Sequence, residues 1–328
     1  MTVDADDHGV RLDRFAALRF ADLSRSYARQ LIEDGHLRVN GADARPSTTL
    51  KTGDLVSLRR PFASLTDLVA EDLPLDVVYE DDDLVVVNKA AGMVVHPAPG
   101  HARGTLVNAL LWHYPGMTIG DDLRPGIVHR LDRGTSGLLV VARNSLALQQ
   151  LQAQQQARTM RKLYLAVVDG GFKEESGTID APIGRHQGDR QRMAVIAEGR
   201  AARSHWRVIE RLGDYTLIEV RLETGRTHQI RVHFSYRSRP LLGDPLYGPR
   251  RPRATFGLGR QFLHACLLGF AQPTSGEWLE FRAALPADLQ QVRDALRRRA
   301  AGPPGAPAPL AYIGDAPDAE DLLLDDDA

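Results

Sequence analysis

The segment Gly126-Ile127-Val128-His129-Arg130-Leu131-Asp132-Arg133-Gly134-Thr135-Ser136-Gly137-Leu138-Leu139-Val140-Val141 places two apolar runs on either side of a short polar insert. Short apolar runs bounded by glycine and polar residues are typical of strands. Gly134 and Gly137 suit a sharp connection, because glycine adopts backbone angles that other residues avoid. The segment therefore predicts a strand, a loop and a second strand.

A single carboxylate, Asp132, lies at the start of this loop with Arg130 and Arg133 close by in sequence. A lone acid presented among cations at a strand end is a candidate catalytic group. A loop aspartate that caps its own backbone is the commoner structural explanation. The segment by itself leaves both interpretations open.

Length and composition exclude several classes of protein. A chain of 328 residues suits one large domain or two domains. No apolar run reaches the length of a membrane span, and the acidic N-terminus lacks the apolar core of a signal peptide. The single cysteine, Cys266, excludes an internal disulfide framework and a cysteine-rich zinc site. We therefore expect a cytoplasmic protein that binds no membrane.

Charge is segregated along the chain although the net charge is only −1. Residues 67–83 carry eight acidic side chains and residues 314–328 carry seven, and neither range holds a lysine or arginine. The remainder is basic and rich in arginine, whose planar fork suits phosphate and base-edge recognition. This distribution favours an RNA-binding protein. The acidic tail is expected to solubilise the chain, or alternatively to compete with RNA for the basic face.

Changes in composition predict five regions in the chain. They are a disordered lead at 1–8, a small basic module at 9–60, a linker at 61–73, a large domain at 74–300 and a disordered tail at 301–328.

The region at 9–60 has two short amphipathic helices, the second capped by Ser24, and then a strand that enters an Asn-Gly turn. The stretch Ser-Arg-Ser-Tyr-Ala-Arg-Gln-Leu-Ile-Glu-Asp-Gly-His-Leu-Arg-Val-Asn-Gly at 24–41 resembles the S4 RNA-binding domain. That family binds structured RNA through its basic helix pair. The resemblance implies RNA contacts at Arg25 and Arg29. A small solvated α/β module without RNA binding is the alternative.

In the region at 74–300, strands outnumber helices and often follow one another directly. This order favours an α+β domain with a mixed, mostly antiparallel sheet. The predicted elements include a hairpin at 77–89, helices at 105–113, 145–157 and 289–300, strands at 160–168, 203–211, 215–222, 263–270 and 278–281, and a helix that Thr227 caps. Residues 178–200 predict either a mobile basic loop or an exposed hairpin.

Several common enzyme motifs are missing from the sequence. It has no Walker A phosphate loop, no dinucleotide-binding fingerprint after a strand and no Gly-x-Ser-x-Gly elbow. A metal-dependent hydrolase that uses His228, His233 and Asp132 is conceivable, but the two histidines are five residues apart and lack an obvious third ligand. We therefore expect no metal.

Four stretches in order resemble the RluA-type family of pseudouridine synthases, in the branch that modifies large-subunit ribosomal RNA. They are GIVHRLDRGTSGLLVVA at 126–142, RKLYLAVVDG at 161–170, LETGRTHQIRVH with PLLGDPLYG at 222–248, and RQFLHACLLGF at 260–270. The resemblance implies isomerisation of uridine to pseudouridine in RNA without a cofactor.

The same resemblance assigns a catalytic role to three residues. Asp132 would be the catalytic carboxylate, acting either by covalent attack or by proton removal. Tyr164 would pack against the target uracil, and Arg231 would pair with Asp132 and keep it ionised. The target base would have to leave its stack to reach Asp132.

Three more residues are expected to contact RNA. Arg130 would occupy the vacated space or clamp the flipped nucleotide, unless it forms a phosphate contact or a structural ion pair. If residues 129–132 form a strand, Arg130 and Asp132 share one side and His129 faces the core. Arg226 and His228 would contact the RNA backbone or support Arg231. The expected partner is structured RNA, with large-subunit rRNA first, and the protein is expected to be a monomer. The alternative is a catalytically inactive RNA-binding or ribosome-assembly protein of the same fold.

Overall fold

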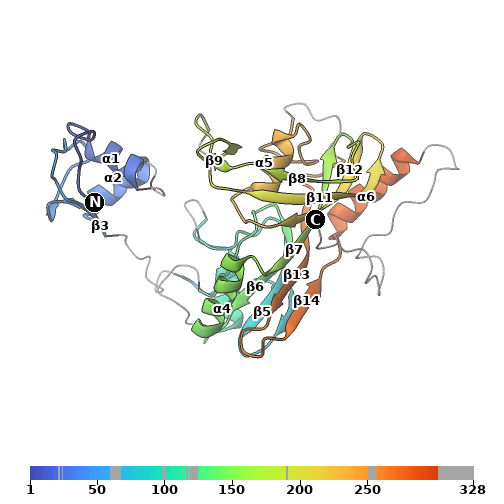
Figure 1. Ribbon diagram of the computed structural model, residues 1–328. Helices are drawn as coiled ribbons and strands as arrows, with labels where there is room; N and C mark the ends of the chain where they lie inside the picture. Colours follow the sequence, from blue (N-terminus) through green and yellow to red (C-terminus); the bar gives the residue numbers. More distant parts are fainter. Residues whose placement is uncertain are drawn as a thin grey trace. The chain divides into compact units, whose positions relative to one another are not determined.

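The computed structural model describes residues 1–20, 23, 25–59, 68–97, 101–115, 117, 125–189, 191–249 and 256–301. These residues form two compact units, a smaller one within residues 1–68 and a larger one that starts at Val69 (Figure 1). Ser24, most of the predicted linker, residues 250–255 and the tail from residue 302 lie outside the described residues. Each unit is considered by itself below.

The smaller unit packs two helices on a three-stranded antiparallel sheet with the strand order β2-β1-β3. Its elements are α1 (Leu12–Arg19), α2 (Arg25–Glu33), β1 (Leu37–Val39), β2 (Ala42–Asp43) and β3 (Val56–Leu58). Asn40 and Gly41 join β1 to β2 with φ values of 52° and 81°. Positive φ at both central residues is the geometry that an Asn-Gly hairpin turn requires, so the predicted strand and turn are confirmed.

The structure differs from the predicted disordered lead at residues 1–8. Val3 is buried in the core of the smaller unit, and the Met1 amine donates a hydrogen bond to the Val56 carbonyl. Arg19 forms ion pairs with Asp4 and Asp7. The acidic composition suggested disorder, but Val3 joins the core, Thr2 pairs with Leu55, and Arg19 of α1 neutralises two of the acids.

The larger unit is built on one twisted sheet whose strand order is β4-β5-β6-β13-β7-β12-β11-β8, with β14 paired to β13 (Figure 1). Its strands are β4 (Val77–Glu80), β5 (Leu84–Lys89), β6 (Ser136–Ala142), β7 (Arg161–Asp169), β8 (Ser176–Asp180), β11 (Arg203–Leu212), β12 (Tyr215–Leu222), β13 (Leu263–Ala271) and β14 (Trp278–Arg282). Its helices are α3 (Leu106–His113), α4 (Ser145–Ala157), α5 (Gln229–Tyr236) and α6 (Ala287–Ala300). Only β6 and β13 run parallel within this sheet, so the predicted mixed, mostly antiparallel α+β fold is confirmed.

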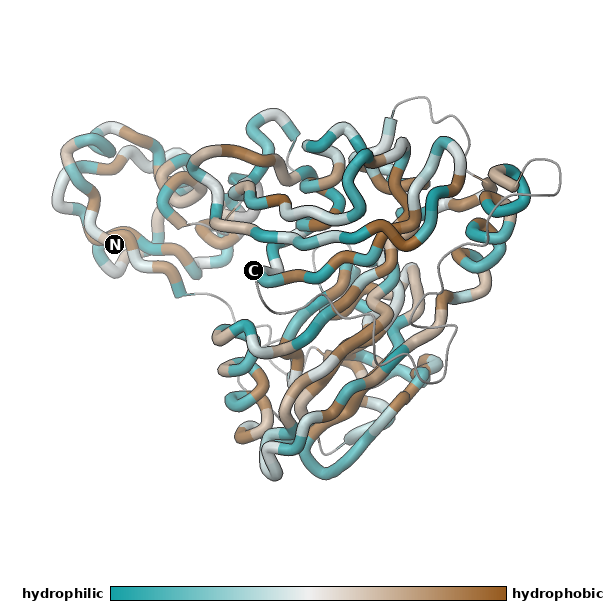
Figure 2. The backbone as a smooth tube through the Cα atoms, turned by 45° about the vertical axis from the view of Figure 1, so that its right-hand side comes forward, coloured by the Kyte–Doolittle hydropathy of each residue, from teal (hydrophilic) through white to brown (hydrophobic). Residues whose placement is uncertain are grey.

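The middle of the sheet is covered on both faces, which explains its near-continuous apolar strands. On β7, Tyr164, Ala166 and Val168 join one hydrophobic cluster, while Leu163, Leu165 and Val167 join the cluster beneath α6. Figure 2 shows hydrophobic stretches along the strands and hydrophilic residues at many turns. Because successive side chains of a strand point to opposite faces, this register fixes Tyr164 on the face away from α6.

The segment at 126–141 forms only one of its two predicted strands. Residues 136–142 form β6, but Ile127 makes a single bridge to Val141 and residues 128–132 join no ladder. β5 pairs along the whole of one edge of β6, and β13 takes the start of the other edge through Ser136 and Gly137. Beyond Gly137 that second edge is met by the Ile127 bridge and by the bond from the Ala142 N–H to the Gly126 carbonyl, and residues 128–132 then run past the sheet instead of joining it.

The region at 178–200 contains an antiparallel hairpin, β9 (Ile183–Arg185) with β10 (Met193–Val195), which follows β8 and is partly buried against Val232 of α5 and Tyr247. Of the two possibilities left open by the sequence, the hairpin is the one that forms. Among the described residues, every helix is too short or too polar to cross a bilayer.

Candidate active site

A pocket of about 270 Å³ lies in the larger unit, where residues 128–132 pass β7 and the start of α5. Asp132, Tyr164 and Arg231 all border it. These residues are far apart in the sequence, and the fold brings them together. Residues 129–132 form no strand, so alternation does not select the side chains here, and all five residues from Val128 to Asp132 border the pocket. His129 also packs against β6, because its Nε2 accepts a hydrogen bond from the Val140 N–H and burial lowers its pKa to about 3.

Asp132 and Arg231 form an ion pair at the wall of this pocket. Arg231 Nη1 donates to Asp132 Oδ2 at 3.0 Å, and the two side chains are 6% and 17% exposed. Such a charge-assisted bond fixes the carboxylate in one orientation at the pocket wall. Asp132 Oδ1 is left toward the pocket, 3.9 Å from His228 Nε2. The expected pairing of Arg231 with Asp132 is confirmed.

A second carboxylate, Asp244, holds Arg231 from the other side. Arg231 Nε and Nη2 donate to its two oxygens at 2.8 and 3.0 Å, and the Asp244 side chain is fully buried. Asp244 Oδ1 also accepts the backbone N–H groups of Leu246 and Tyr247. The guanidinium lies 5.0 Å from the centre of the Tyr247 ring. Arg231 therefore has one orientation, which aims Nη1 at Asp132.

Sequence reasoning missed Asp244 and Tyr247. Both lie in the stretch Gly243-Asp244-Pro245-Leu246-Tyr247, which was interpreted only as a turn-rich loop within a family motif. A carboxylate in a motif that otherwise contains turn and apolar residues was the available signal. Its partner is thirteen positions away, so only the folded chain shows the pairing.

We expect Asp244→Asn to lower both stability and activity. The amide would present an N–H to a guanidinium that has only donors, so a buried charge loses its partner. Breaking such a pair costs about 3 kcal/mol of unfolding free energy, and a displaced Arg231 reduces kcat/KM by roughly a hundredfold. Urea unfolding and single-turnover kinetics measure the two effects. Asp214→Asn is the control, because Asp214 forms an exposed pair with Arg299 at 3.7 Å; a loss as small as the control's would refute this role for Asp244.

Tyr164 lies in the buried wall of the pocket with Ile230 and Leu263. Burial raises the pKa of its phenol, and the nearby Asp132 charge adds to the effect. The side chain is therefore a neutral phenol at neutral pH. Its ring offers an apolar surface of the kind on which a nucleobase stacks.

Two buried amines, Lys89 and Lys162, lie in the region of the pocket. Lys89 Nζ donates to the carbonyls of Ala90 and Met93 at 2.8 and 2.9 Å, and burial lowers its pKa to about 7 although Asp132 opposes the shift. Lys162 borders the pocket, donates to Gln155 Oε1 at 2.6 Å, and has a pKa lowered to about 8 by burial. Neither amine was identified from the sequence.

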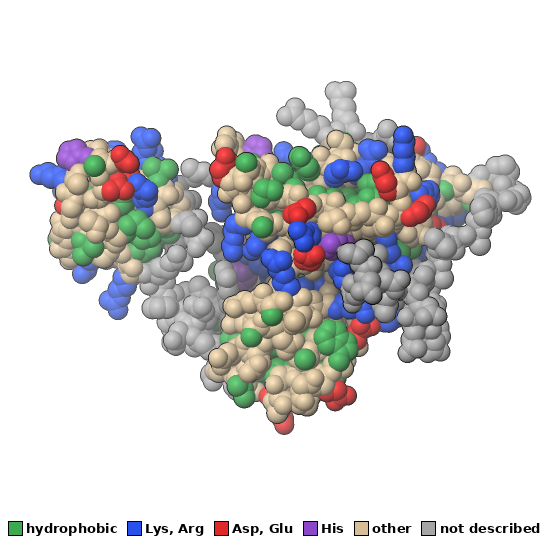
Figure 3. All heavy atoms as spheres, in the orientation of Figure 1, with side chains coloured by type: hydrophobic (Ala, Val, Ile, Leu, Met, Phe, Trp, Pro, Cys, Tyr) green, Lys and Arg blue, Asp and Glu red, His purple; other side chains and the backbone are tan. Residues whose placement is uncertain are grey.

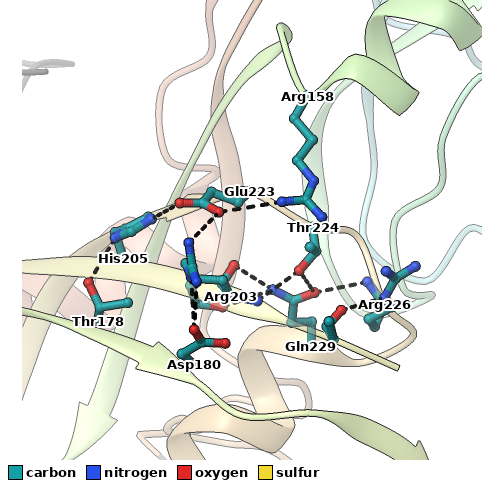
Figure 4. Close-up of polar contacts among 11 residues, drawn as sticks. Arg158, Thr178, Asp180, Arg203, His205, Glu223, Thr224, Arg226 and Gln229 are labelled. Atoms are coloured by element: carbon teal, nitrogen blue, oxygen red, sulfur yellow. Dashed lines mark hydrogen bonds and ion pairs between the residues drawn. The ribbon is translucent and has the colours of Figure 1, made fainter. Parts of the chain in front are cut away.

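The turn before α5 is held by a side-chain network (Figure 4). Gln229 Oε1 accepts hydrogen bonds from the Thr224 hydroxyl and the Arg226 backbone, and Gln229 Nε2 donates to the Arg203 carbonyl. The predicted cap at Thr227 is wrong, because His228 occupies the N-cap position and makes no capping bond through its side chain. The side chain of Gln229, the first residue of α5, thus takes the place of a capping hydroxyl by accepting hydrogen bonds from the turn.

The candidate RNA contacts differ in how they are placed. Arg130 is exposed and Arg226 is half-buried, and both border the pocket. Arg226 Nε donates to the Ala201 carbonyl, and its pKa is lowered by burial and by the charges of Arg200 and Arg158. Figure 3 shows Lys and Arg side chains gathered along the band between the upper and lower halves of the larger unit. Contact with RNA through these arginines stays a prediction.

The arrangement does not favour the metal-dependent alternative. His233 is buried, with its ring nitrogens bonded to Ser204 Oγ and the Ala181 carbonyl, so it does not reach Asp132. Within the described ranges, no cluster of three or more His, Cys, Asp or Glu side chains could hold a metal ion.

Comparison with known proteins identifies the family. Residues 83–236 match the model of the RNA pseudouridylate synthase family. A protein of Chloroflexus aurantiacus, named an uncharacterized RNA pseudouridine synthase, is 58% identical over 88% of this chain and 91% of its own. The chain belongs to the RNA pseudouridine synthase family. Ribosomal large subunit pseudouridine synthase D of Pseudomonas aeruginosa is 45% identical over 88% of this chain and 93% of its own.

The smaller unit and the solved structures agree with this family. Residues 10–56 match the S4 domain. The structure of human RNA pseudouridylate synthase domain containing 1 superimposes with a TM-score of 0.52 and 28% identity, over 70% of this chain and 96% of that one. This RNA pseudouridine synthase thus joins an S4 domain to the family's catalytic fold, as the sequence motifs predicted.

Proposed function

We propose that this RNA pseudouridine synthase isomerises specific uridines of large-subunit ribosomal RNA, with Asp132 as the essential group. The observation that carries the proposal is the Asp132–Arg231 ion pair at the wall of a pocket that Tyr164 also borders. Large-subunit rRNA is proposed as the substrate because the relative in Pseudomonas aeruginosa is named a ribosomal large subunit pseudouridine synthase. Residues 9–60 would bind the RNA, and residues 74–300 would carry the chemistry.

The reaction exchanges an N-glycosidic bond for a carbon–carbon bond within one nucleotide, so the detached base must stay in the pocket. A flipped base would stack on Tyr164, while Asp132 Oδ1 acts at the sugar or base. Arg231 holds Asp132 in one rotamer, which either a nucleophile or a proton acceptor needs. Arg130, at the rim, would hold the flipped nucleotide in place.

The competing proposal is a catalytically inactive RNA-binding protein of the same fold. Such a protein would have no need for a buried arginine held by one carboxylate and aimed at another. The deciding experiment maps pseudouridines in ribosomal RNA and tRNA from cells with and without this protein, and then treats unmodified rRNA with the purified protein. Loss and restoration of the same rRNA sites would support the proposal, whereas sites confined to tRNA would contradict the rRNA assignment.

We also propose that α2 contributes cations to RNA binding. Arg29 and Glu33 form an exposed ion pair, with side chains 64% and 55% exposed. Arg29→Ala removes one phosphate partner, so we expect binding of folded rRNA to weaken a few-fold and the slope of log K against log salt to fall by about one. Glu33→Ala breaks the same pair but leaves the cation, and serves as the control. Equal binding by the two variants in a filter-binding titration would rule out a phosphate contact at Arg29.

A further inference from the structure

His228 is held in an uncommon backbone conformation at the edge of the pocket. It has φ 58° and ψ 21°, which is the left-handed region, and it directly precedes α5. Residues other than glycine stay in this region only when the surroundings enforce it, and such positions cluster at functional sites. Here the Gln229 side chain fixes the turn, and the His228 ring borders the pocket.

A chain of hydrogen bonds sets the tautomer of this ring. The Met193 backbone N–H donates to Tyr247 Oη at 2.8 Å, and His228 Nδ1 lies 2.8 Å from the same oxygen. Tyr247 is buried, and in the described part of the chain its hydroxyl hydrogen has no acceptor other than His228 Nδ1. The hydroxyl therefore donates to Nδ1, which places the single hydrogen of a neutral ring on Nε2. Burial lowers the pKa of His228, which keeps the ring neutral at pH 7.

The hydrogen on Nε2 faces Asp132 across a gap. Nε2 and Oδ1 are 3.9 Å apart, which is too long for a direct hydrogen bond. Their side chains are 19% and 17% exposed, so a bound molecule can reach both. A single oxygen atom placed between them would lie within hydrogen-bond distance of both groups. It would accept from Nε2 and donate to Oδ1, and a hydroxyl group does both.

We propose that His228 Nε2 and Asp132 Oδ1 together bind the ribose 2′-hydroxyl of the target nucleotide. The inference rests on the proposed function, which brings that nucleotide into this pocket. Within an RNA chain the 3′ and 5′ oxygens of a ribose are bonded to phosphorus, so the 2′-hydroxyl is its one free hydroxyl. It is also the group that distinguishes RNA from DNA. His228 would therefore contribute to the selection of RNA over DNA at the reacting nucleotide.

The test compares two substrates that differ by one oxygen. The first is a synthetic RNA stem–loop around a uridine that the full chain converts, and the second carries 2′-deoxyuridine at that position. We expect the wild type to convert the ribose substrate about tenfold faster in single turnover, as the loss of one well-made hydrogen-bond pair implies. The ratio of the two rates reports on this contact, because a change in overall fold or affinity alters both rates alike.

Two substitutions of His228 separate the loss of the Nε2 contact from a general effect on folding. Asparagine tolerates left-handed backbone angles but is too short to replace Nε2, so His228→Asn should reduce the ratio to about two or less. His228→Gln places an amide N–H near the lost Nε2 and should keep most of the ratio. His205→Ala, on β11 outside the pocket, is the control and should show the wild-type ratio.

The possible outcomes distinguish the inference from the proposed function. A wild-type ratio near one, as expected if water fills the gap, overturns the inference and leaves the proposed function standing. A wild-type ratio retained in His228→Asn assigns the hydroxyl to another residue and also overturns it. A wild-type protein that converts no uridine in any RNA refutes both. Tyr247→Phe, which frees the tautomer, should give an intermediate ratio and provides a second variant if both His228 variants fail to fold.

Discussion

Asp132→Asn is expected to abolish pseudouridine formation while RNA binding survives. The amide has nearly the shape of the carboxylate, but it has neither the charge nor the basicity that covalent attack or proton removal requires. Loss of an essential reacting group typically lowers the rate by about 10⁴-fold or more. Arg231 would keep its two bonds to Asp244, so the fold should persist.

Two measurements on the same variant make this test specific. Single-turnover assays on unmodified rRNA give the rate, and a binding titration gives the Kd, which should be unchanged or tighter because the cationic pocket loses a negative charge. The same exchange at an exposed ion pair, Asp214→Asn, controls for the chemistry of the substitution. A variant that forms pseudouridine within roughly a hundredfold of the wild-type rate would contradict an essential role for Asp132.

The regular elements could be predicted because their signals are local. The helix α4 has the predicted bounds, Ser145–Ala157, since Asn144 caps it and its apolar positions repeat with the helical period. β7 is an apolar run buried on both faces, which is typical of a central strand. The strand predicted at 126–128 is reduced to one bridge between Ile127 and Val141, and its local apolar pattern does not show how far such pairing with a distant segment extends.

The candidate site also contains residues that the sequence predicts and residues that it does not. Motif resemblance suggested Asp132, Tyr164 and Arg231, and the structure brings all three to one pocket. The role of Asp244 could not be predicted, because its carboxylate acts through Arg231, and a turn residue shows no sign of its distant partner. The orientation of His228 depends on Tyr247 and on the Met193 backbone, which lies on a separate hairpin. Contacts between residues on three separate segments produce no repeating pattern in the sequence, so sequence analysis does not detect them.

Gly137→Ala is expected to cause the largest loss of stability. Gly137 has a φ of 117°, which side-chain-bearing residues rarely adopt, and a Cβ added there would lie 2.2 Å from the Ala265 carbonyl oxygen. That oxygen belongs to β13, which pairs in parallel with β6 through Ser136 and Gly137. The nearest atoms all belong to the Ala265 backbone, so they cannot move aside without breaking the pairing of β6 with β13, which directly follows the Asp132 loop. We expect a loss of about 3–5 kcal/mol of unfolding free energy.

Gly171→Ala is the matched control for this substitution. A Cβ at Gly171 would have no atom within 4 Å, and its φ is not positive, so the same exchange should change stability by less than about 1 kcal/mol. Urea unfolding of the two variants and the wild type gives the comparison. A Gly137→Ala protein as stable as the Gly171→Ala protein would mean that β6 and β13 can separate by more than an ångström without loss. In that case the close approach at Gly137 would not fix the Asp132 loop on the sheet, and another contact, such as the bond from Lys89 Nζ to the Arg133 carbonyl, would have to hold it.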